Sequence, residues 1–507
     1  MSGAAKHTRI FASVIAIAAL VFAATPSHAL DIKKLTLSNG ATLLVSEEHH
    51  LPMMTMMIEF DAGTRRDPKG KEGLAELTAR CLSQGTKELT APEFDQKVDF
   101  MGSSVGVSAE RDYATAGMTT LKKYQGETLQ LMAGILTEPG LRDDDIVRKR
   151  AEQVAEIKAA EEQPGYTADV EFTKDLFGDR PYGHPGAGSS DSVAKLTNDD
   201  VRGFYRDYYK LGNAIIAVAG DVSADEVKAS LEKSLAGLAG TVEPQAEPSP
   251  ISVAPGLGVK LIDRNVMQAN IIMGSAGVAR SNPDFYKLKV MNYILGGGGF
   301  SSRLVKVVRS AHGLAYSIDS GFEPGKFQGA FEIALQTKNQ SSNEAIDLIL
   351  QQLREIQEKP VSDAELDGAK KFLIGSFPLG IERQSSNEAI DLVLQQLREI
   401  QEKPVSDAEL DGAKKFLIGS FPLALERQSA IASFMVQIEF YGLGLDYADQ
   451  YTKLIESVTK DDVLAVAKKY LHPDAMIVVA VANQAEAKIK TSQTSPTEKA
   501  ADALGAQ

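Results

Sequence analysis

Alternating and helical patterns of apolar residues follow one another along the chain. Alternation over 35–45, on either side of Asn39-Gly40, predicts a hairpin with a type I′ turn, and residues 55–60 predict a further strand. Helical periodicity predicts amphipathic helices at 73–82, 92–101, 122–137, 142–162 and 223–236. The first half of the chain therefore mixes strands and helices.

A proline-rich stretch over 241–256 divides the chain, because its composition forms neither a helix nor a central strand. We assign 30–240 to an N-terminal domain and 257–484 to a C-terminal domain. In the second domain, 270–277 predicts a strand ending in Ala-Gly, followed by a helix, a glycine loop, a helix and strands. This order echoes the first domain and predicts two related α+β domains. Residues 485–507 are polar and predict a mobile tail.

A 44-residue segment occurs twice in succession inside the second domain. Residues 341–384 and 385–428 differ only at the pairs Ile349/Val393, Gly380/Ala424 and Ile381/Leu425. Each copy predicts a helical hairpin with a Lys-Pro-Val turn, and repeat proteins need three or more units to bury a continuous surface. We interpret the segment as a recent duplication, or as a sequencing or assembly artefact, in a 463-residue ancestor. One hairpin can pack on the domain, and the other is displaced or covers it.

Capping-box spacing, a Ser followed by Glu three positions later, marks the predicted start of several helices. The pairs are Ser223/Glu226, Ser341/Glu344, Ser362/Glu365, Ser385/Glu388 and Ser406/Glu409.

The first 29 residues have the features of a secretory signal peptide. Lys6 and Arg9 precede an apolar run over 10–24, and Ser27-His28-Ala29 has the small-x-small pattern of a cleavage site. The run is too short to span a bilayer comfortably. We expect cleavage near Ala29 and a mature protein, without a transmembrane segment, in a bacterial periplasm or outside the cell.

The net negative charge of the chain excludes some classes of binding partner. The chain has 54 Lys and Arg against 68 Asp and Glu, a formal charge of −14, and 43% apolar residues, which is ordinary globular usage. A chain this acidic, without a basic stripe, argues against nucleic acid as a partner. The single cysteine, Cys81, excludes an intramolecular disulfide.

One stretch of the first domain has the frame of a metal-binding helix without its ligands. It reads Gly-Leu-Ala-Glu76-Leu-Thr-Ala79-Arg80, followed by Gly-Thr. The frame resembles the zinc motif of the inverzincin metallopeptidases of the pitrilysin/insulinase family, Gly-x-Ala-His-x-x-Glu-His, which a Glu about 75 residues later completes. By this resemblance Glu76 and Arg80 replace the two His ligands, Ala79 replaces the general base, and Glu156 stands at the third ligand position.

These residues are unsuited to a catalytic zinc, because Arg80 places a fixed positive charge where the metal belongs. We expect no metal in this chain. Glu76 and Arg80 have the i,i+4 spacing of a helical ion pair, worth roughly 0.3–0.5 kcal/mol on an exposed helix. If the fold is as resembled, Glu156 also reaches Arg80, and the former metal site becomes a carboxylate–guanidinium–carboxylate cluster.

A second informative stretch follows the glycine run at 296–299 and contains Arg309 and, seven residues later, Tyr316. It is similar to the family's second-domain segment, in which an Arg and a Tyr face the zinc across the closed chamber. A guanidinium and a phenol can donate hydrogen bonds to a peptide carbonyl and to the oxyanion formed on attack. The resemblance implies that Arg309 and Tyr316 are this pair.

The resemblance covers nearly the whole mature chain and implies one half of a clamshell, in which two homologous domains each carry a largely antiparallel sheet covered by helices. It also implies a catalytically incomplete subunit, inactive alone and without a cofactor. Such a subunit forms a heterodimer with a paralogous zinc-bearing subunit, supplies Arg309 and Tyr316 in trans, and cleaves peptides with it. Two alternatives remain open. One is a structural or peptide-binding homologue without a catalytic role, and the other is an independent metallopeptidase that uses Glu76 and Glu156.

Overall fold

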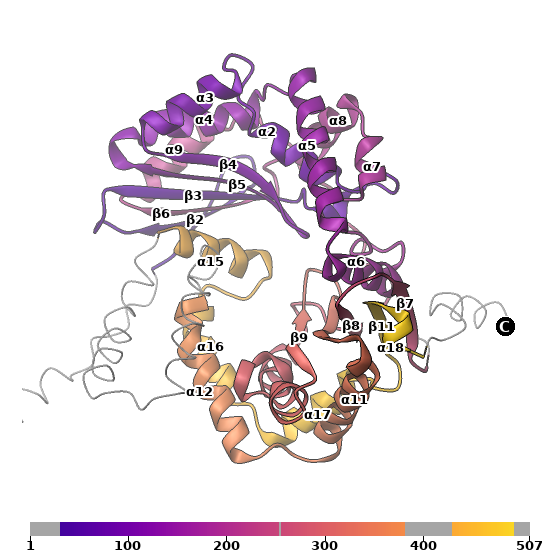
Figure 1. The fold of residues 1–507 in the computed structure, drawn as a ribbon. Coiled ribbons are helices and arrows are strands. Elements are labelled where there is room, and N and C mark those ends of the chain that lie inside the picture. Colours follow the sequence, from indigo (N-terminus) through magenta and orange to yellow (C-terminus); the bar gives the residue numbers. More distant parts are fainter. Residues whose placement is uncertain (1–30, 253–254, 381–427, 491–507) are drawn as a thin grey trace, which may run out of the picture.

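The computed structural model of the 507-residue chain describes residues 31–252, 255–380 and 428–490 (Figure 1). The predicted signal peptide, the second 44-residue copy up to residue 427, and the last 17 residues lie outside these ranges. Within them the chain forms two domains, each built around one sheet.

The first domain contains a six-stranded sheet in the order β1-β2-β6-β3-β5-β4. Only β2 and β6 pair in parallel; the other neighbours are antiparallel. Its strands are β1 (Lys33–Thr36), β2 (Thr42–Glu47), β3 (Met53–Phe60), β4 (Ser104–Ala109), β5 (Ala114–Leu121) and β6 (Ile215–Gly220). Its helices are α2 (Leu74–Leu82), α3 (Ala91–Phe100), α4 (Gln125–Thr137), α5 (Asp143–Glu161), α6 (Pro164–Phe177), α7 (Ser190–Ala194), α8 (Asn198–Tyr208) and α9 (Ala224–Ser234), with short turns η1 (Thr64–Arg66) and η2 (Lys122–Tyr124).

The second domain contains a five-stranded sheet in the order β7-β11-β8-β10-β9. Its strands are β7 (Gly258–Asp263), β8 (Gln268–Ala276), β9 (Ala315–Glu323), β10 (Ala330–Lys338) and β11 (Ile477–Ala482). Its helices are α10 (Phe285–Asn292), α11 (Ser342–Glu358), α12 (Asp363–Gly380), α15 (Gln428–Phe440), α16 (Tyr447–Glu456), α17 (Lys460–Tyr470) and α18 (Gln484–Ala487), with short turns η3 (Tyr293–Gly297), η4 (Gly299–Ser301), η5 (Val305–Ala311) and η6 (Asn339–Ser341).

The two sheets share one topology. In each, a strand near the start of the domain pairs in parallel with the last strand, β2 with β6 and β7 with β11. The following strand, β3 or β8, pairs antiparallel with that last strand, and β5-β4 or β10-β9 continue the sheet. This shared order confirms two related α+β domains.

In each domain, one helix packs on the sheet of the other domain. Helix α15 lies against the first sheet, where Ile431, Ala432, Met435 and Val436 pack on a buried surface that includes Ala217. Helix α6 lies against the second sheet and buries Phe172 and Leu176 with Ile272 and Val479. Both helices therefore lie between the domains (Figure 1). Apolar stripes on helices must be buried, and here the partner is the neighbouring domain.

A buried carboxylate joins the two halves beside these helices. Asp112 is 4% exposed and accepts hydrogen bonds from the Tyr182 hydroxyl, from the Lys326 backbone N–H at 2.8 Å and from the Tyr441 hydroxyl at 3.3 Å. Tyr182 belongs to the first domain, whereas Lys326 and Tyr441 belong to the second. Because a buried carboxylate needs such donors, Asp112 fixes the two domains relative to each other.

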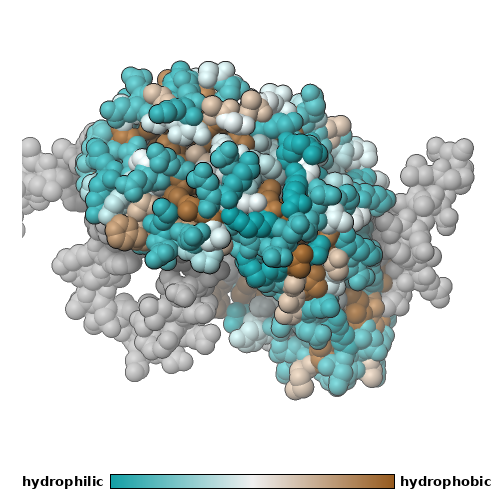
Figure 2. Space-filling model, turned by 90° about the horizontal axis from the view of Figure 1, so that it is seen from above, coloured by the Kyte–Doolittle hydropathy of each residue, from teal (hydrophilic) through white to brown (hydrophobic). Residues whose placement is uncertain are grey.

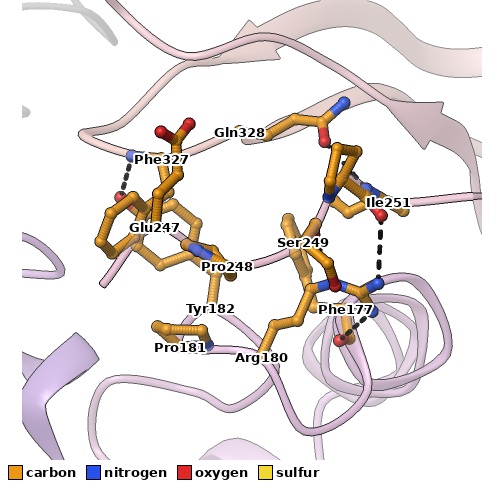
Figure 3. Close-up of a pocket in the computed structure, with 11 residues that line it drawn as sticks. Phe177, Arg180, Pro181, Tyr182, Glu247, Pro248, Ser249, Ile251, Phe327 and Gln328 are labelled. Atoms are coloured by element: carbon orange, nitrogen blue, oxygen red, sulfur yellow. Dashed lines mark hydrogen bonds between the residues drawn. The ribbon is translucent and has the colours of Figure 1, made fainter. Parts of the chain in front are cut away.

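The proline-rich linker crosses the same junction. Arg180 donates to the carbonyls of Ser249 and Pro250, both at 3.2 Å, and the Gln328 side chain accepts from the Ile251 N–H at 3.0 Å (Figure 3). Residues 241–252 contain no helix or strand. Residues of the linker, together with Tyr182 and Phe327, line a small cavity at the junction between the two domains.

Three local predictions were wrong. The first hairpin has a three-residue loop in which only Gly40 has a positive φ, 95°, so the turn is type I with a bulge and not type I′. Ser223 and Ser341 make no side-chain cap, whereas the Ser362/Glu365 box forms. Glu47 instead accepts from the N–H of Ala224 at 2.8 Å, which satisfies a donor at the start of α9. The boxes of the second copy lie outside the described residues.

The predicted polar tail begins too early. Ala487 and Ile489 are 2% and 3% exposed and belong to the core of the second domain. Asn343 in α11 donates to the carbonyl of Ala487 at 3.0 Å, which fixes this segment to the first repeat copy. The domain therefore extends to at least Lys490, the last described residue.

The outer face seen from above is mainly hydrophilic, with small, scattered apolar patches (Figure 2). Among the described residues, no helix is both long and apolar enough to cross a membrane.

Candidate functional site

Helix α2 carries the degenerate zinc motif, and its start is firmly fixed. Gly73 has a φ of 91°, in the left-handed region, and a Cβ here would lie 2.4 Å from the carbonyl oxygen of Ala187. The Asp67 carboxylate accepts hydrogen bonds from the N–H groups of Gly73 and Ala75 at 2.8 and 2.7 Å. Asp67 thus caps the helix, and burial raises the pKa of its carboxyl group to about 8 despite these two hydrogen bonds.

Helix α5 is positioned against α2 by a buried amide. The Gln153 side chain is fully buried and donates to the carbonyls of Gly73 at 3.1 Å and Ala187 at 2.8 Å. Glu156 lies three residues further along α5 and therefore on the same side of that helix. This contact explains how a carboxylate distant in sequence reaches α2.

Arg80 connects two carboxylates. Its Nε lies 2.7 Å from Oε1 of Glu76, and its Nη1 lies 2.7 Å from Oε2 of Glu156. The side chains of Arg80 and Glu76 are 29% and 22% exposed, and that of Glu156 is 59% exposed. Burial alone would lower the pKa of Arg80, but the hydrogen bonds to both carboxylates raise it overall, so the guanidinium stays charged. The ion-pair cluster expected from the sequence is present.

These residues do not fit a zinc ion. Both carboxylates already bind a permanent cation, and the side chain at position 79 is a fully buried methyl group that cannot act as a base. Glu110 adds a further carboxylate near Glu76. Burial raises the pKa of Glu110, and the charge of Glu76 adds to this rise. Among the described residues, no group of three or more His, Cys, Asp or Glu is arranged to hold a metal.

The glycine run and the residues after it form an irregular, tightly packed segment of the second domain. Turns η3 and η5 are π-helical, a form often found at functional sites, and η4 lies between them. Arg309 lies on η5 and Tyr316 on β9, and both side chains face solvent, with Tyr316 67% exposed. Within the described part of the chain, neither the Arg309 guanidinium nor the Tyr316 hydroxyl makes a hydrogen bond or ion pair.

The structure does not bring the two motifs together within this chain. Helix α2 belongs to the first domain and β9 to the second, and they lie in opposite halves (Figure 1). Arg309 and Tyr316 lie on adjacent, packed elements, and among the described residues no hydrogen bond or ion pair joins them to Arg80, Glu76 or Glu156. Any shared chemistry would therefore need another molecule or another arrangement of the halves.

The strand edge beside α2 is partly occupied. Strand β4 is at the edge of the first sheet, and the N–H of Val107 donates to the Ser83 hydroxyl at 3.0 Å instead of remaining open. A peptide adding to this edge would have to displace that bond. Ser83 has no signal in the sequence, since only the fold places it against the edge.

Phe300 likewise has no signal in the sequence. Its ring is 52% exposed and lies 5.2 Å from the guanidinium carbon of Arg309. The nine-residue separation of the two residues gives no periodic signal, and the glycine run brings them together.

Comparisons with known proteins agree with this geometry. The family model "Insulinase (Peptidase family M16)" matches residues 43–188, and the model "Peptidase M16 inactive domain" matches residues 195–373. Together they cover more than half of the chain.

Individual relatives span both domains. A non-peptidase homolog, YmxG, from Helicobacter pylori is 28% identical over 341 residues, covering 66% of this chain and 78% of that protein. An uncharacterized zinc protease, SCO5738, from Streptomyces coelicolor is 28% identical over 364 residues, covering 69% and 77%. A crystal structure of a peptidase M16 inactive domain from Pseudomonas fluorescens superposes with a TM-score of 0.74 at 25% identity, covering 92% of this chain and all of that one.

Two family models, a shared two-domain fold and the degenerate motif on α2 lead to one assignment. The chain belongs to the insulinase family, peptidase family M16.

Proposed function

We propose that this chain is the catalytically incomplete subunit of a two-chain peptidase and pairs with a zinc-bearing paralogue. In this account the partner holds the zinc, which activates water and polarises the peptide carbonyl. This chain contributes Arg309 and Tyr316 to the shared site. The pair would donate hydrogen bonds to the carbonyl oxygen as it becomes an oxyanion.

One contrast supports the proposal. The charge of Arg80 is neutralised by Glu76 and Glu156, so the first domain offers neither a metal site nor a free cation there. Arg309 and Tyr316 are solvent-facing and make no polar contact in the described part of the chain, so they are available to another molecule.

The partly occupied β4 edge does not favour the purely peptide-binding alternative, because Ser83 already accepts the N–H of Val107. The independent metallopeptidase is not favoured either, because both of its candidate ligands, Glu76 and Glu156, bind Arg80.

A reconstitution experiment tests the proposal. The purified chain is mixed with a paralogue containing His-x-x-Glu-His, and cleavage of a fluorogenic peptide library is measured for each chain alone and for the mixture. We expect cleavage only in the mixture. Arg309→Ala should lower kcat/KM by roughly 10²- to 10³-fold, the usual effect of losing one oxyanion donor, and Tyr316→Phe should also lower it.

A matched control shows whether the loss of activity is specific to Arg309 or follows from removing any exposed arginine. Arg206 lies on α8 of the first domain, is 73% exposed and pairs only with the adjacent Asp207 among the described residues. Arg206→Ala should leave the mixture fully active. Full activity of the Arg309→Ala mixture would refute the assigned role, and chelator-sensitive cleavage by this chain alone would establish an independent enzyme.

The proposed location is the periplasm or the cell exterior. N-terminal sequencing of the mature protein should begin close to Leu30. An N-terminus at Met1 in the purified protein would contradict the predicted cleavage near Ala29.

A further inference from the structure

Phe300 is a large apolar side chain that a hydrogen-bonded turn exposes to solvent. The Ser301 hydroxyl donates to the carbonyl of Gly298 and the Ser302 hydroxyl to that of Gly299, both at 2.7 Å. Ser302 is fully buried, and Gly299 has a φ of 53°, which favours glycine. The turn that exposes Phe300 is therefore fixed by its own hydrogen bonds.

The glycine run brings η3, the segment just before this turn, against the strand that carries Tyr316. A Cβ on Gly296 would lie 2.3 Å from the Ser320 hydroxyl of β9, and a Cβ on Gly298 would lie 2.5 Å from the carbonyl oxygen of Tyr293. Only glycine permits this approach. Turn η5, which carries Arg309, packs both on η4, which carries Phe300, and on β9, which carries Tyr316.

The Phe300 ring contacts the Arg309 guanidinium. This contact neither neutralises the guanidinium nor occupies its N–H donors. Its centroid lies 5.2 Å from the guanidinium carbon, within the range of a cation–π interaction. Arg303, six residues earlier, is held differently: Glu365 accepts from its Nε at 2.7 Å and from its Nη2 at 3.1 Å. A carboxylate would neutralise the guanidinium and occupy its N–H groups, whereas an aromatic ring restricts its position and leaves those groups free.

We infer that Phe300 is a positioning residue, which orients the Arg309 guanidinium toward a carbonyl or oxyanion ligand while leaving its N–H donors available. The geometric part of this inference stands on the contact itself, and its kinetic consequence rests on the proposed function. The two parts are tested separately.

NMR of the full chain with ¹⁵N-labelled arginine tests the geometric part. The Arg309 side-chain resonance, assigned by its loss in Arg309→Ala, should be shifted by the ring current of Phe300. Phe300→Leu should abolish that shift, and Phe300→Tyr should retain it. Phe100→Leu is the matched control, since Phe100 is 80% exposed on α3 of the first domain. An Arg309 resonance that is identical in wild type and Phe300→Leu would overturn the inference.

The reconstituted mixture tests the kinetic part. Phe300→Leu should lower kcat/KM by about two- to fivefold, the effect expected for one exposed cation–π contact, and Phe300→Tyr should restore it. In an Arg309→Ala background, Phe300→Leu should cause no further loss, because both changes act through one group. Independent, multiplicative losses would contradict a positioning role. An inactive wild-type mixture would refute the proposed function and leave the NMR result to decide the inference.

Discussion

Nη1 of Arg80 on helix α2 lies 2.7 Å from Oε2 of Glu156 on helix α5. This pair joins two residues 76 positions apart and places a permanent cation between the two carboxylates of the degenerate motif. The Arg80 guanidinium thus joins helices α2 and α5 through an ion pair with Glu156.

Restoring the ligands should restore metal binding. In the variant Glu76→His/Arg80→His, two imidazoles at i,i+4 and the Glu156 carboxylate would face one point, so we expect tight, stoichiometric zinc binding by isothermal titration calorimetry. The control adds Glu156→Gln, which should weaken binding markedly. A folded double variant that binds no zinc would show that Glu156 is not positioned as the third ligand.

The ion pair between Arg303 and Glu365 predicts a pH dependence of stability. Burial works to raise the pKa of Glu365, but hydrogen bonds from Arg303 and Ser362 outweigh it and lower the pKa from 4.5 to about 2. Because the folded-state pKa lies below the unfolded one, the stabilisation is complete above about pH 4.5 and is lost as the pH falls toward 2.

Urea unfolding at pH 6 and pH 3.5 measures this effect. Glu365→Gln should destabilise the chain at pH 6 and make less difference at pH 3.5. An equal effect at both pH values would show that the carboxylate does not titrate as expected.

The packing around Asp112 predicts that replacing Gly325 and replacing Gly321, both in the second domain, have different effects on the free energy of unfolding. A Cβ on Gly325 would lie 2.5 Å from the Tyr182 hydroxyl and 2.9 Å from Oδ2 of Asp112, whereas a Cβ on Gly321 of β9 would meet nothing within 4 Å. Gly325→Ala should therefore lower the free energy of unfolding by about 1–3 kcal/mol, as overpacking does, and Gly321→Ala should not lower it. Equal effects in thermal unfolding would mean that the junction is not tightly packed.

The near identity of the two 44-residue copies predicts that one copy alone is enough for the second domain to fold. Residues 342–358 and 363–380 of the first copy form α11 and α12, and residues of both helices are buried in the second-domain core. Deleting 385–428, or deleting 341–384 instead, should preserve folding and leave the unfolding midpoint unchanged or raised. A large loss of stability in both deletions would show that both copies are integrated.

The two deletions also form a matched pair, since their products differ only at the three non-identical positions. Ile349 is fully buried, and its counterpart is Val393. Adding Val393→Ile to the deletion of 341–384 should raise the free energy of unfolding by about 0.5–1.5 kcal/mol, the usual worth of one buried methylene. No gain would mean that Val393 does not take the place of Ile349.

The Arg80 cluster could be predicted because one of its ion pairs depends on local spacing and the other on the family resemblance. Helical spacing places Glu76 beside Arg80, and the family frame supplies Glu156. Five helices of the first domain and the repeated strand order were predicted from local patterns, whereas α6, α7 and α8 were not predicted. The predicted cap at Ser223 does not form, and Glu47, on another element, accepts the N–H of Ala224 at the start of α9.

Long-range packing could not be predicted in this way. The apolar residues of α15 predict burial but do not indicate which sheet covers them, and they pack on the other domain. The segment around Ile489 is polar in composition, yet Ile489 is buried. Neither the contact of Phe300 with Arg309 nor that of Ser83 with Val107 has a sequence signature, since both depend on how separate elements meet.

The metal content of the isolated, tag-free mature chain tests the central claim most directly, by inductively coupled plasma mass spectrometry after dialysis against a zinc-containing buffer. The account predicts no stoichiometric zinc, because Arg80 holds both remaining carboxylates. One zinc ion per chain, lost on Glu156→Gln, would contradict it.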